Sequence, residues 1–523
     1  MPPYLGVPTP PTVTPLPVLV PEQQHFTPFI PTVYGNIDYR EWQGQLMRID
    51  EILSTGLVEE SFQRLALANR NTQEQAEAEK ETRLFRSLTT TEQESFQELS
   101  SQALRCNIAR TLTGESYRRF ACHLAESALL QWFCGMGRLD EIHLPGKSAL
   151  QRYSEWIPEA EMRKVVDRLL TAATQFNPGK KQPDLELEEP LDLDAYFLDT
   201  TCVKLNIHFP VDWVLLRDAA RTLMKATILI RDRGLKVRME EPKEFLKRMN
   251  QLCIRMSHAR RKKDSKRIRK AVLREMKKLS KVIEGHAQRH HDLLEKYWME
   301  TDLKEGEARQ ILGRIEVILE RLPYAVKQAH ERIIGERQVS NVEKILSLYE
   351  GHAAVYVRGK ADAEVEFGLQ LLLGECNSGV IVDWELVCGL PQADTKMLGR
   401  SLERLAEGEQ DRTPRAIGGD RGFDSKANRG KLEVKGIFNG LCPRDPRDLK
   451  KRMEESEFVG LQQRRSQTEA RISIFKNNFW GAPLKSKGYT NQNLEVAWSV
   501  LTHNLWVIAR FPKRAMRVFS KAS

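Results

Sequence analysis

The chain has 523 residues, of which 41% are hydrophobic and 29% charged, and its formal net charge is +10. No apolar run approaches the ~18 residues of a membrane span, and no charged residue precedes Glu22, so the basic start of a signal peptide is absent. We therefore expect a cytoplasmic globular protein of two to four domains, with no membrane partner and with a polyanionic one.

Two regions precede the first predicted strands. Residues 1–32 contain ten of the 24 prolines, which predicts an extended arm. Residues 33–175 have helical periodicity. Within them, an amphipathic segment, a Gly/Pro-rich turn and a short helix capped by Ser148 follow one another. This order fits a helix-turn-helix that reads DNA, and it equally fits a helical hairpin that only packs.

Residues 176–215 are predicted to hold the first strands, after a polar linker over 174–190. Two aromatic and β-branched runs, Ala195–Asp199 and Val203–Phe209, read as adjoining strands.

Residues 216–350 form a long helical insertion. Its segment 255–281 carries thirteen Lys or Arg against two acids, which favours contact with a nucleic-acid backbone over a merely solvated face. We assign that contact to four consecutive cations: Arg260, Arg261, Lys262 and Lys263. The adjacent His290 and His291 are expected to be solvated rather than to bind metal.

Residues 351–510 alternate between strands and helices. Strands are expected at 354–357, 365–373, 380–387, up to Asp420, and at 436–441. Helices are expected at 395–405, from Ser425, and over 459–510, interrupted near 481–483. A basic tail, 511–523, follows. Without the insertion the order is β-β-β-α-β-α-β-α, a ribonuclease-H-like topology in which the first and fourth strands are neighbours. The predicted class is multidomain α and α/β: N-terminal helices plus a ribonuclease-H-like mixed sheet interrupted by helices.

Three acids stand out against this topology. Asp199 and Asp420 each follow an apolar, strand-like run, and neighbouring strands would bring them together. At 100° per residue, Arg465, Glu469 and Lys476 lie within about 40° of one another on one helix face. Carboxylates at the end of a sheet, with two cations beside them, suit a site that holds Mg²⁺ or Mn²⁺, two ions in all, against a phosphodiester. The alternative is a set of solvated acids and a helical ion pair.

Three further residues compete for roles in this site. Asp383 also lies in a predicted strand and is the best rival carboxylate, although an edge or outward position explains it more simply. Arg358 and Lys360 flank a glycine at a predicted turn and are candidate phosphate contacts.

Four segments, Tyr196–Thr201, Asn206–Trp213, Gly419–Ser425 and Arg465-x3-Glu469-x6-Lys476, resemble the DDE transposases of bacterial insertion sequences. The resemblance covers residues 191–215 and 351–510, about a third of the chain. It implies that Asp199, Asp420 and Glu469 bind the metal ions and that Arg465 and Lys476 are the accompanying basic positions. Related elements carry a Tyr three residues before the Arg. Here that position is Gln462, so the role of that Tyr is not carried over.

The resemblance implies an enzyme that cuts and joins double-stranded DNA at the ends of its element. It implies a nucleoid-associated protein that acts as a homodimer or higher oligomer, with residues 33–175 binding the DNA ends. Two alternatives remain: a metal-dependent nuclease of the same fold that does not join strands, and a non-catalytic DNA-binding protein derived from a transposase.

Overall fold

The computed structural model describes residue 30 and residues 32–137, 142–174, 176–177, 182–183, 185–259, 261–360, 363–408, 411–481 and 483–513. Most of the predicted arm, Arg260 and most of the basic tail lie outside these residues. No helix within the described ranges is long and apolar enough to cross a membrane.

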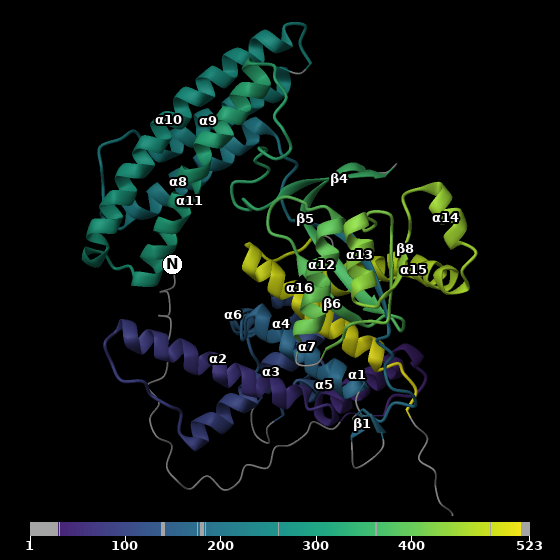
Figure 1. The fold of residues 1–523 in the computed structure, drawn as a ribbon. Helices are drawn as coiled ribbons and strands as arrows, with labels where there is room; N and C mark the ends of the chain where they lie inside the picture. Colours follow the sequence, from purple (N-terminus) through teal and green to yellow (C-terminus); the bar gives the residue numbers. More distant parts are fainter. Residues whose placement is uncertain are drawn as a thin grey trace, which may run out of the picture.

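A mixed six-stranded sheet lies at the centre of the molecule (Figure 1). Its strands are β3 (Ala195–Lys204), β4 (Ala354–Lys360), β5 (Ala363–Cys376), β6 (Ile381–Leu386), β7 (Ala416–Gly419) and β8 (Phe438–Leu441). The long β5 pairs antiparallel with β3 on one edge, and with β4 and then β6 on the other. Strands β7 and β8 continue the sheet beyond β3, parallel to it. The predicted combination of helices and a mixed sheet is therefore confirmed.

Helices cover both faces of the sheet. Alternation along β3 sends Tyr196 and Leu198 into a core with α12 (Asp394–Glu407) and α13 (Lys426–Val434). Phe197 points to the opposite face and packs with Leu461 of α15 (Ser456–Phe475). Ser425 caps α13 by accepting a hydrogen bond from the Asn428 amide. A short helix that the sequence did not predict, α14 (Pro446–Arg452), precedes α15.

The N-terminal helices share one hydrophobic core with the sheet and with α16 (Tyr489–Ile508). In Figure 1 the yellow α16 runs between the sheet and the purple and blue N-terminal helices. Phe62 and Trp498, for example, have ring centroids 5.7 Å apart. The N-terminal helices are α1 (Ile37–Thr55), α2 (Val58–Lys80), α3 (Thr90–Thr113), α4 (Tyr117–Glu126), α5 (Ala128–Phe133), α6 (Lys147–Ser154) and α7 (Glu159–Thr174).

The expected helix-turn-helix corresponds to α4, α5 and α6. Gly146 caps α6, and Ser148, the predicted cap, lies inside the helix, so that detail was wrong. Leu150 and Tyr153 of α6 are buried, and Trp498 Nε1 donates to the Ser154 carbonyl at 2.9 Å. One side of α6 is therefore committed to packing.

The insertion is a separate helical bundle with its own hydrophobic core (Figure 1, teal). It contains α8 (Asp212–Asp232), α9 (Pro242–Ala259), α10 (Ser265–Tyr297), the 3-10 turn η1 (Trp298–Glu300), α11 (Glu305–Ala329) and the π turn η2 (His330–Ile334). The amphipathic pattern of the sequence thus predicted the bundle, although its last helix ends well before residue 350.

Three local predictions were wrong. The two strands expected between 195 and 209 are one strand, β3, because pairing with β5 is continuous from Tyr196 to Lys204. Asp199 therefore lies in mid-strand rather than at a strand end. The 174–190 linker contains a small antiparallel pair, β1 (Phe176–Asn177) and β2 (Gln182–Pro183). His290 and His291 are buried rather than solvated.

Asp383, the rival carboxylate, is 2% exposed and points inward, not outward. Arg404 of α12 binds it with two hydrogen bonds of 2.7 and 2.8 Å. Ser401 donates to the same carboxylate at 2.7 Å, and Ser401 Oγ also lies 2.6 Å from Tyr196 Oη. Asp383 therefore ties α12 to the sheet and has no opening to a substrate.

Arg404→Met should destabilise the protein by about 3 kcal/mol or more, because it leaves a buried carboxylate without its main partner. Arg267→Met is the control: Arg267 pairs with Asp264 at the surface, where an ion pair contributes under ~1 kcal/mol. Chemical denaturation measures both. If Arg404→Met and Arg267→Met lower the free energy of unfolding by the same small amount, this role for Asp383 is contradicted.

Candidate functional site

The register of β3 and β7 brings Asp199 and Asp420 together. Phe197 pairs with Gly418 on the parallel strands; Asp199 follows Phe197 by two residues within β3, and Asp420 follows Gly418 by two residues, directly after β7. Neighbouring strands lie about 4.8 Å apart, and residues two apart share a face. Asp199 thus points to the face covered by α15, and Asp420 lies beside it at the carboxyl end of β7. The predicted adjacency of these two strands is confirmed.

Helix α15 brings Glu469 to the same place. Gln462 anchors the helix, since its Nε2 donates to the carbonyls of Gly419 (3.3 Å) and Gly440 (2.6 Å) at the ends of β7 and β8. Glu469 follows Gln462 by seven residues, about two turns, and so lies on the same side of α15. The residue that departs from the family pattern therefore has a structural role of its own here.

All three predicted carboxylates line one cavity of about 500 Å³, which we call the carboxylate cavity. Its walls come from β3, β4, the start of α12, the end of β7 and the last turns of α15. The lining residues are Asp199, Thr200, Thr201, Lys204, Tyr356, Val357, Asp394, Asp420, Glu469, Ile472, Ser473, Lys476 and Asn477.

Asp394 is a fourth carboxylate in this cavity, and the sequence reasoning missed it. Its Oδ1 accepts hydrogen bonds from Thr200 Oγ1 (3.0 Å) and Gln370 Nε2 (3.3 Å). A Cβ atom at Gly422 would overlap Asp394 Oδ2 and approach Asp420 Oδ1 to 2.9 Å, so a glycine at this position leaves room for both acids. An acid in the first turn of a helix is common for its effect on the helix dipole, so local sequence carried no further signal.

Burial, together with neighbouring negative charge, raises the pKa of two of these carboxylates, Asp199 and Asp394. Burial raises the pKa of Asp199 to about 6. The Thr200 amide, which donates to Asp199 Oδ1 at 2.7 Å, opposes this shift, whereas the charges of Asp420 and Glu469 add to it. Burial also raises the pKa of Asp394, with the Thr200 hydroxyl opposing and the Asp420 charge adding to the shift. The carboxylate cavity therefore concentrates negative charge that neighbouring protein groups only partly neutralise.

Both predicted cations, Arg465 and Lys476, lie near this charge. Lys476 lines the cavity, and its Nζ donates to Thr201 Oγ1 at 3.1 Å. Arg465 donates to Gln462 Oε1 at 3.2 Å, and its charge lowers the pKa of Asp199. Lys476 begins the π turn η3 (Lys476–Trp480), so α-helical spacing holds up to this residue.

The other predicted contacts lie elsewhere. Arg261, Lys262 and Lys263 are exposed in the turn between α9 and α10, within the helical bundle. Arg358 and Lys360 belong to β4, next to Tyr356 and Val357 of the cavity wall, but their side chains are outside the described part of the structure.

The donor set of the carboxylate cavity suits a hard divalent cation. Its four acids offer oxygen atoms only, and Mg²⁺ and Mn²⁺ prefer carboxylate oxygens and water. A cation there would offset the charges of Asp420 and Glu469, which add to the effect of burial on the pKa of Asp199. Asp199, Asp420 and Glu469 are the residues placed to hold such ions, with Asp394 beside Asp420.

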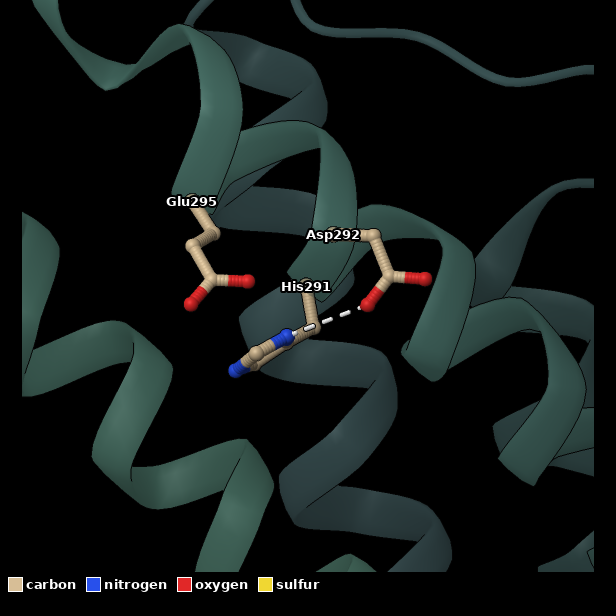
Figure 2. Close-up of side chains that lie close together, drawn as sticks. All are labelled: His291, Asp292 and Glu295. Carbon is tan, nitrogen blue, oxygen red and sulfur yellow. Dashed lines mark hydrogen bonds and ion pairs between the residues drawn. The ribbon is translucent and has the colours of Figure 1, made fainter.

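A second group of candidate ligands lies on α10 (Figure 2). His291, Asp292 and Glu295 have ligand atoms within 4.8 Å of one another. However, His291 Nε2 lies 2.9 Å from Glu316 Oε1 of α11, and its Nδ1 lies 3.3 Å from Asp292 Oδ1. Burial disfavours the charged ring, but these two carboxylates outweigh burial and raise the pKa of His291. This group is explained as a link between α10 and α11.

Comparison of the chain with protein-family models, with curated proteins and with solved structures finds no match.

Asp199→Asn should stabilise the metal-free protein above pH 6. The folded pKa is about 6, above the unfolded value of about 4, so ionisation of Asp199 costs stability as pH rises through 6. Asn cannot ionise, and the gain should be on the order of 2 kcal/mol at about pH 8 and shrink towards pH 4. Denaturation at several pH values measures it.

Mg²⁺ supplies the complementary test. At about pH 8 it should stabilise the wild-type protein and have less effect on Asp199→Asn, because binding to the folded state alone raises stability. If Asp199→Asn is less stable than the wild type at this pH without metal, the expected cost of ionising Asp199 in the folded protein is contradicted.

Proposed function

We propose that this chain is a DDE-type DNA transposase, which cuts and joins DNA at the ends of an insertion sequence with divalent metal. The observation that carries the proposal is the carboxylate cavity, where Asp199, Asp420 and Glu469 meet from three separate elements. The resemblance of the surrounding motifs to DDE transposases selected the same three residues.

The sheet topology supports a ribonuclease-H-like core. Across the second half of β5 the order is β6-β5-β3-β7-β8, with β5 antiparallel to both neighbours and with β3, β7 and β8 parallel. Helix α12 follows β6, α13 follows β7, and α15 follows β8. If β4 and α14 are left out, this is the order β-β-β-α-β-α-β-α that was expected from the sequence.

In the proposed reaction, water attacks a phosphorus atom at the element end, and the bond from phosphorus to O3′ breaks. The freed 3′-hydroxyl then attacks a target phosphodiester, forming a new P–O3′ bond while the target's own P–O3′ bond breaks. Asp199 would hold both ions, and Asp420 and Glu469 one each. The bound ions would neutralise the phosphate and acidify the attacking group, water in the first step and the 3′-hydroxyl in the second. Lys476 and Arg465 would bind phosphate oxygens.

The partner in this proposal is double-stranded DNA, both element ends and target, in the nucleoid. Holding two ends together requires a homodimer or a higher oligomer on DNA. The N-terminal helices remain the proposed reader of the end sequence. Because they share a core with α16, this reading should be tested in the whole chain rather than in a fragment.

Asp199→Asn, Asp420→Asn and Glu469→Gln should each abolish cleavage and joining of DNA that carries the element's own ends, and should spare DNA binding. Each change removes a metal-binding charge and leaves the backbone contacts made elsewhere. Asp394→Asn should slow the reaction less, because its amide oxygen still accepts from Thr200. Gel assays with Mg²⁺ or Mn²⁺ measure strand products and binding together.

Glu457→Gln is the matched control, an acid on α15 that pairs with Arg415 at the surface. Near-normal cleavage by any of the three triad variants removes that residue from the site. Cleavage without joining by the wild type would identify a nuclease instead, and metal-independent binding alone would identify a non-catalytic DNA-binding protein.

Lys476→Ala and Arg465→Ala should slow cleavage at least tenfold, since a charge-assisted contact to phosphate contributes about 1.5 kcal/mol or more. Their thermal midpoints should stay close to that of the wild type. Lys80→Ala, an exposed lysine at the end of α2, is the control. If both residues form only surface contacts, the cleavage rates of all three variants will be equal.

A further inference from the structure

A second cavity, of about 760 Å³, lies at one end of the helical bundle, and we call it the basic cavity. Lys266 and Arg269, from the first turns of α10, form one wall. Arg332 of η2, with Arg337 and Lys344 of the segment that follows, forms the other. Glu336 is the one acid among the described lining residues, so five cations face one carboxylate.

Neighbouring groups hold these cations in place. Arg332 donates to Oδ1 of the buried Asp212 at 2.8 Å, and the Arg269 guanidinium lies 5.4 Å from the centre of the Trp213 ring. Lys344 Nζ donates to Asn341 Oδ1 at 2.6 Å. These contacts reduce the conformational entropy that the side chains would lose on binding a ligand.

Acids only partly compensate the cations. Glu336 is shared by Lys266 (3.1 Å) and Lys270 (2.8 Å). Glu331 pairs with Arg337, and Glu343 accepts from Ser340 at 3.1 Å. With Asp212, the nearby acids number four against six cations, so an excess of positive charge remains.

The cations continue along α10. At 100° per residue, five of them lie within about 80° on one face, and at 1.5 Å per residue they extend about 22 Å from the cavity. These residues are Lys266, Lys270, Arg274, Lys277 and Lys281. A single nucleotide is shorter than this stripe, whereas a nucleic-acid backbone presents a phosphate charge every few ångströms along its length.

Building on the DNA chemistry proposed above, we propose that the basic cavity is a binding site for the phosphate backbone of duplex DNA. Its arginines match phosphate geometry, and Ser340 and Asn341 add neutral donors at its rim. The site is distinct from the cations Arg261, Lys262 and Lys263 of the preceding turn, because three of its cations come from residues 332–344. The contact it makes carries no base-sequence information.

The test measures the salt dependence of binding of the full chain to a labelled duplex of arbitrary sequence, in EDTA. Lys266→Gln combined with Lys344→Gln removes one cation from each wall. Binding should weaken, and the slope of log K against log salt should become shallower by about 0.9 for each phosphate that the protein no longer neutralises. Lys225→Gln combined with Lys243→Gln removes equal charge from exposed positions of the same bundle and should leave the slope unchanged.

Inorganic tripolyphosphate, titrated by calorimetry, separates DNA from a small ligand. The proposal is overturned if the Lys266→Gln, Lys344→Gln variant loses tripolyphosphate binding but keeps the wild-type salt dependence of DNA binding. It is also overturned if this variant and the Lys225→Gln, Lys243→Gln control show the same slope of log K against log salt. Because no metal is present, the outcome is independent of strand cleavage. If the protein never cleaves DNA but the slope changes as expected, the basic cavity is supported as a DNA-binding site and the transposase proposal is contradicted.

Discussion

The parallel pairing of β3 with β7 is the constraint on which the carboxylate cavity depends. It joins segments more than two hundred residues apart and sets Asp199 beside Asp420. Burial is the main cause of the raised pKa of Asp199, and the negative charge of Asp420 adds to it. The pairing holds because Leu198 and Ile417 are buried on one face of these strands, and Phe197 and Ala416 on the other. Apolar burial thus maintains a charge arrangement that is unfavourable by itself.

The helices on the two faces of these strands, α12 and α15, are held by hydrogen bonds to buried groups as well as by apolar contact. On one face, the chain of contacts from Tyr196 through Ser401 to Asp383 secures α12, whose first residue is Asp394. On the other, Gln462 secures α15 to the carbonyls that end β7 and β8. Hydrogen bonds to fixed backbone or buried groups are directional, so each helix delivers its acid to a defined place.

The helical bundle lies between β3 and β4 in the sequence, and a polar contact joins its first and last elements. Asp212, at the start of α8, accepts hydrogen bonds from Gln328 near the end of α11 and from Arg332 of η2. The first and last elements of the insertion are therefore tied together, although 116 residues separate Asp212 from Gln328. The bundle folds around its own core, and the same contact helps to build the wall of the basic cavity.

Local sequence by itself indicated most of the elements and three of the four acids of the cavity. Aromatic and β-branched runs indicated the first strands, Ser425 indicated a helix start, and the spacing of Arg465, Glu469 and Lys476 indicated one helix face. These signals depend on neighbouring residues alone. Tertiary structure decided the rest. Asp394 joins the cavity only through Thr200 and Gln370, Asp383 is buried because Arg404 reaches it, and the strands expected at 195–209 are one because β5 pairs along it. Each of these depends on partners distant in sequence, which no local pattern encodes.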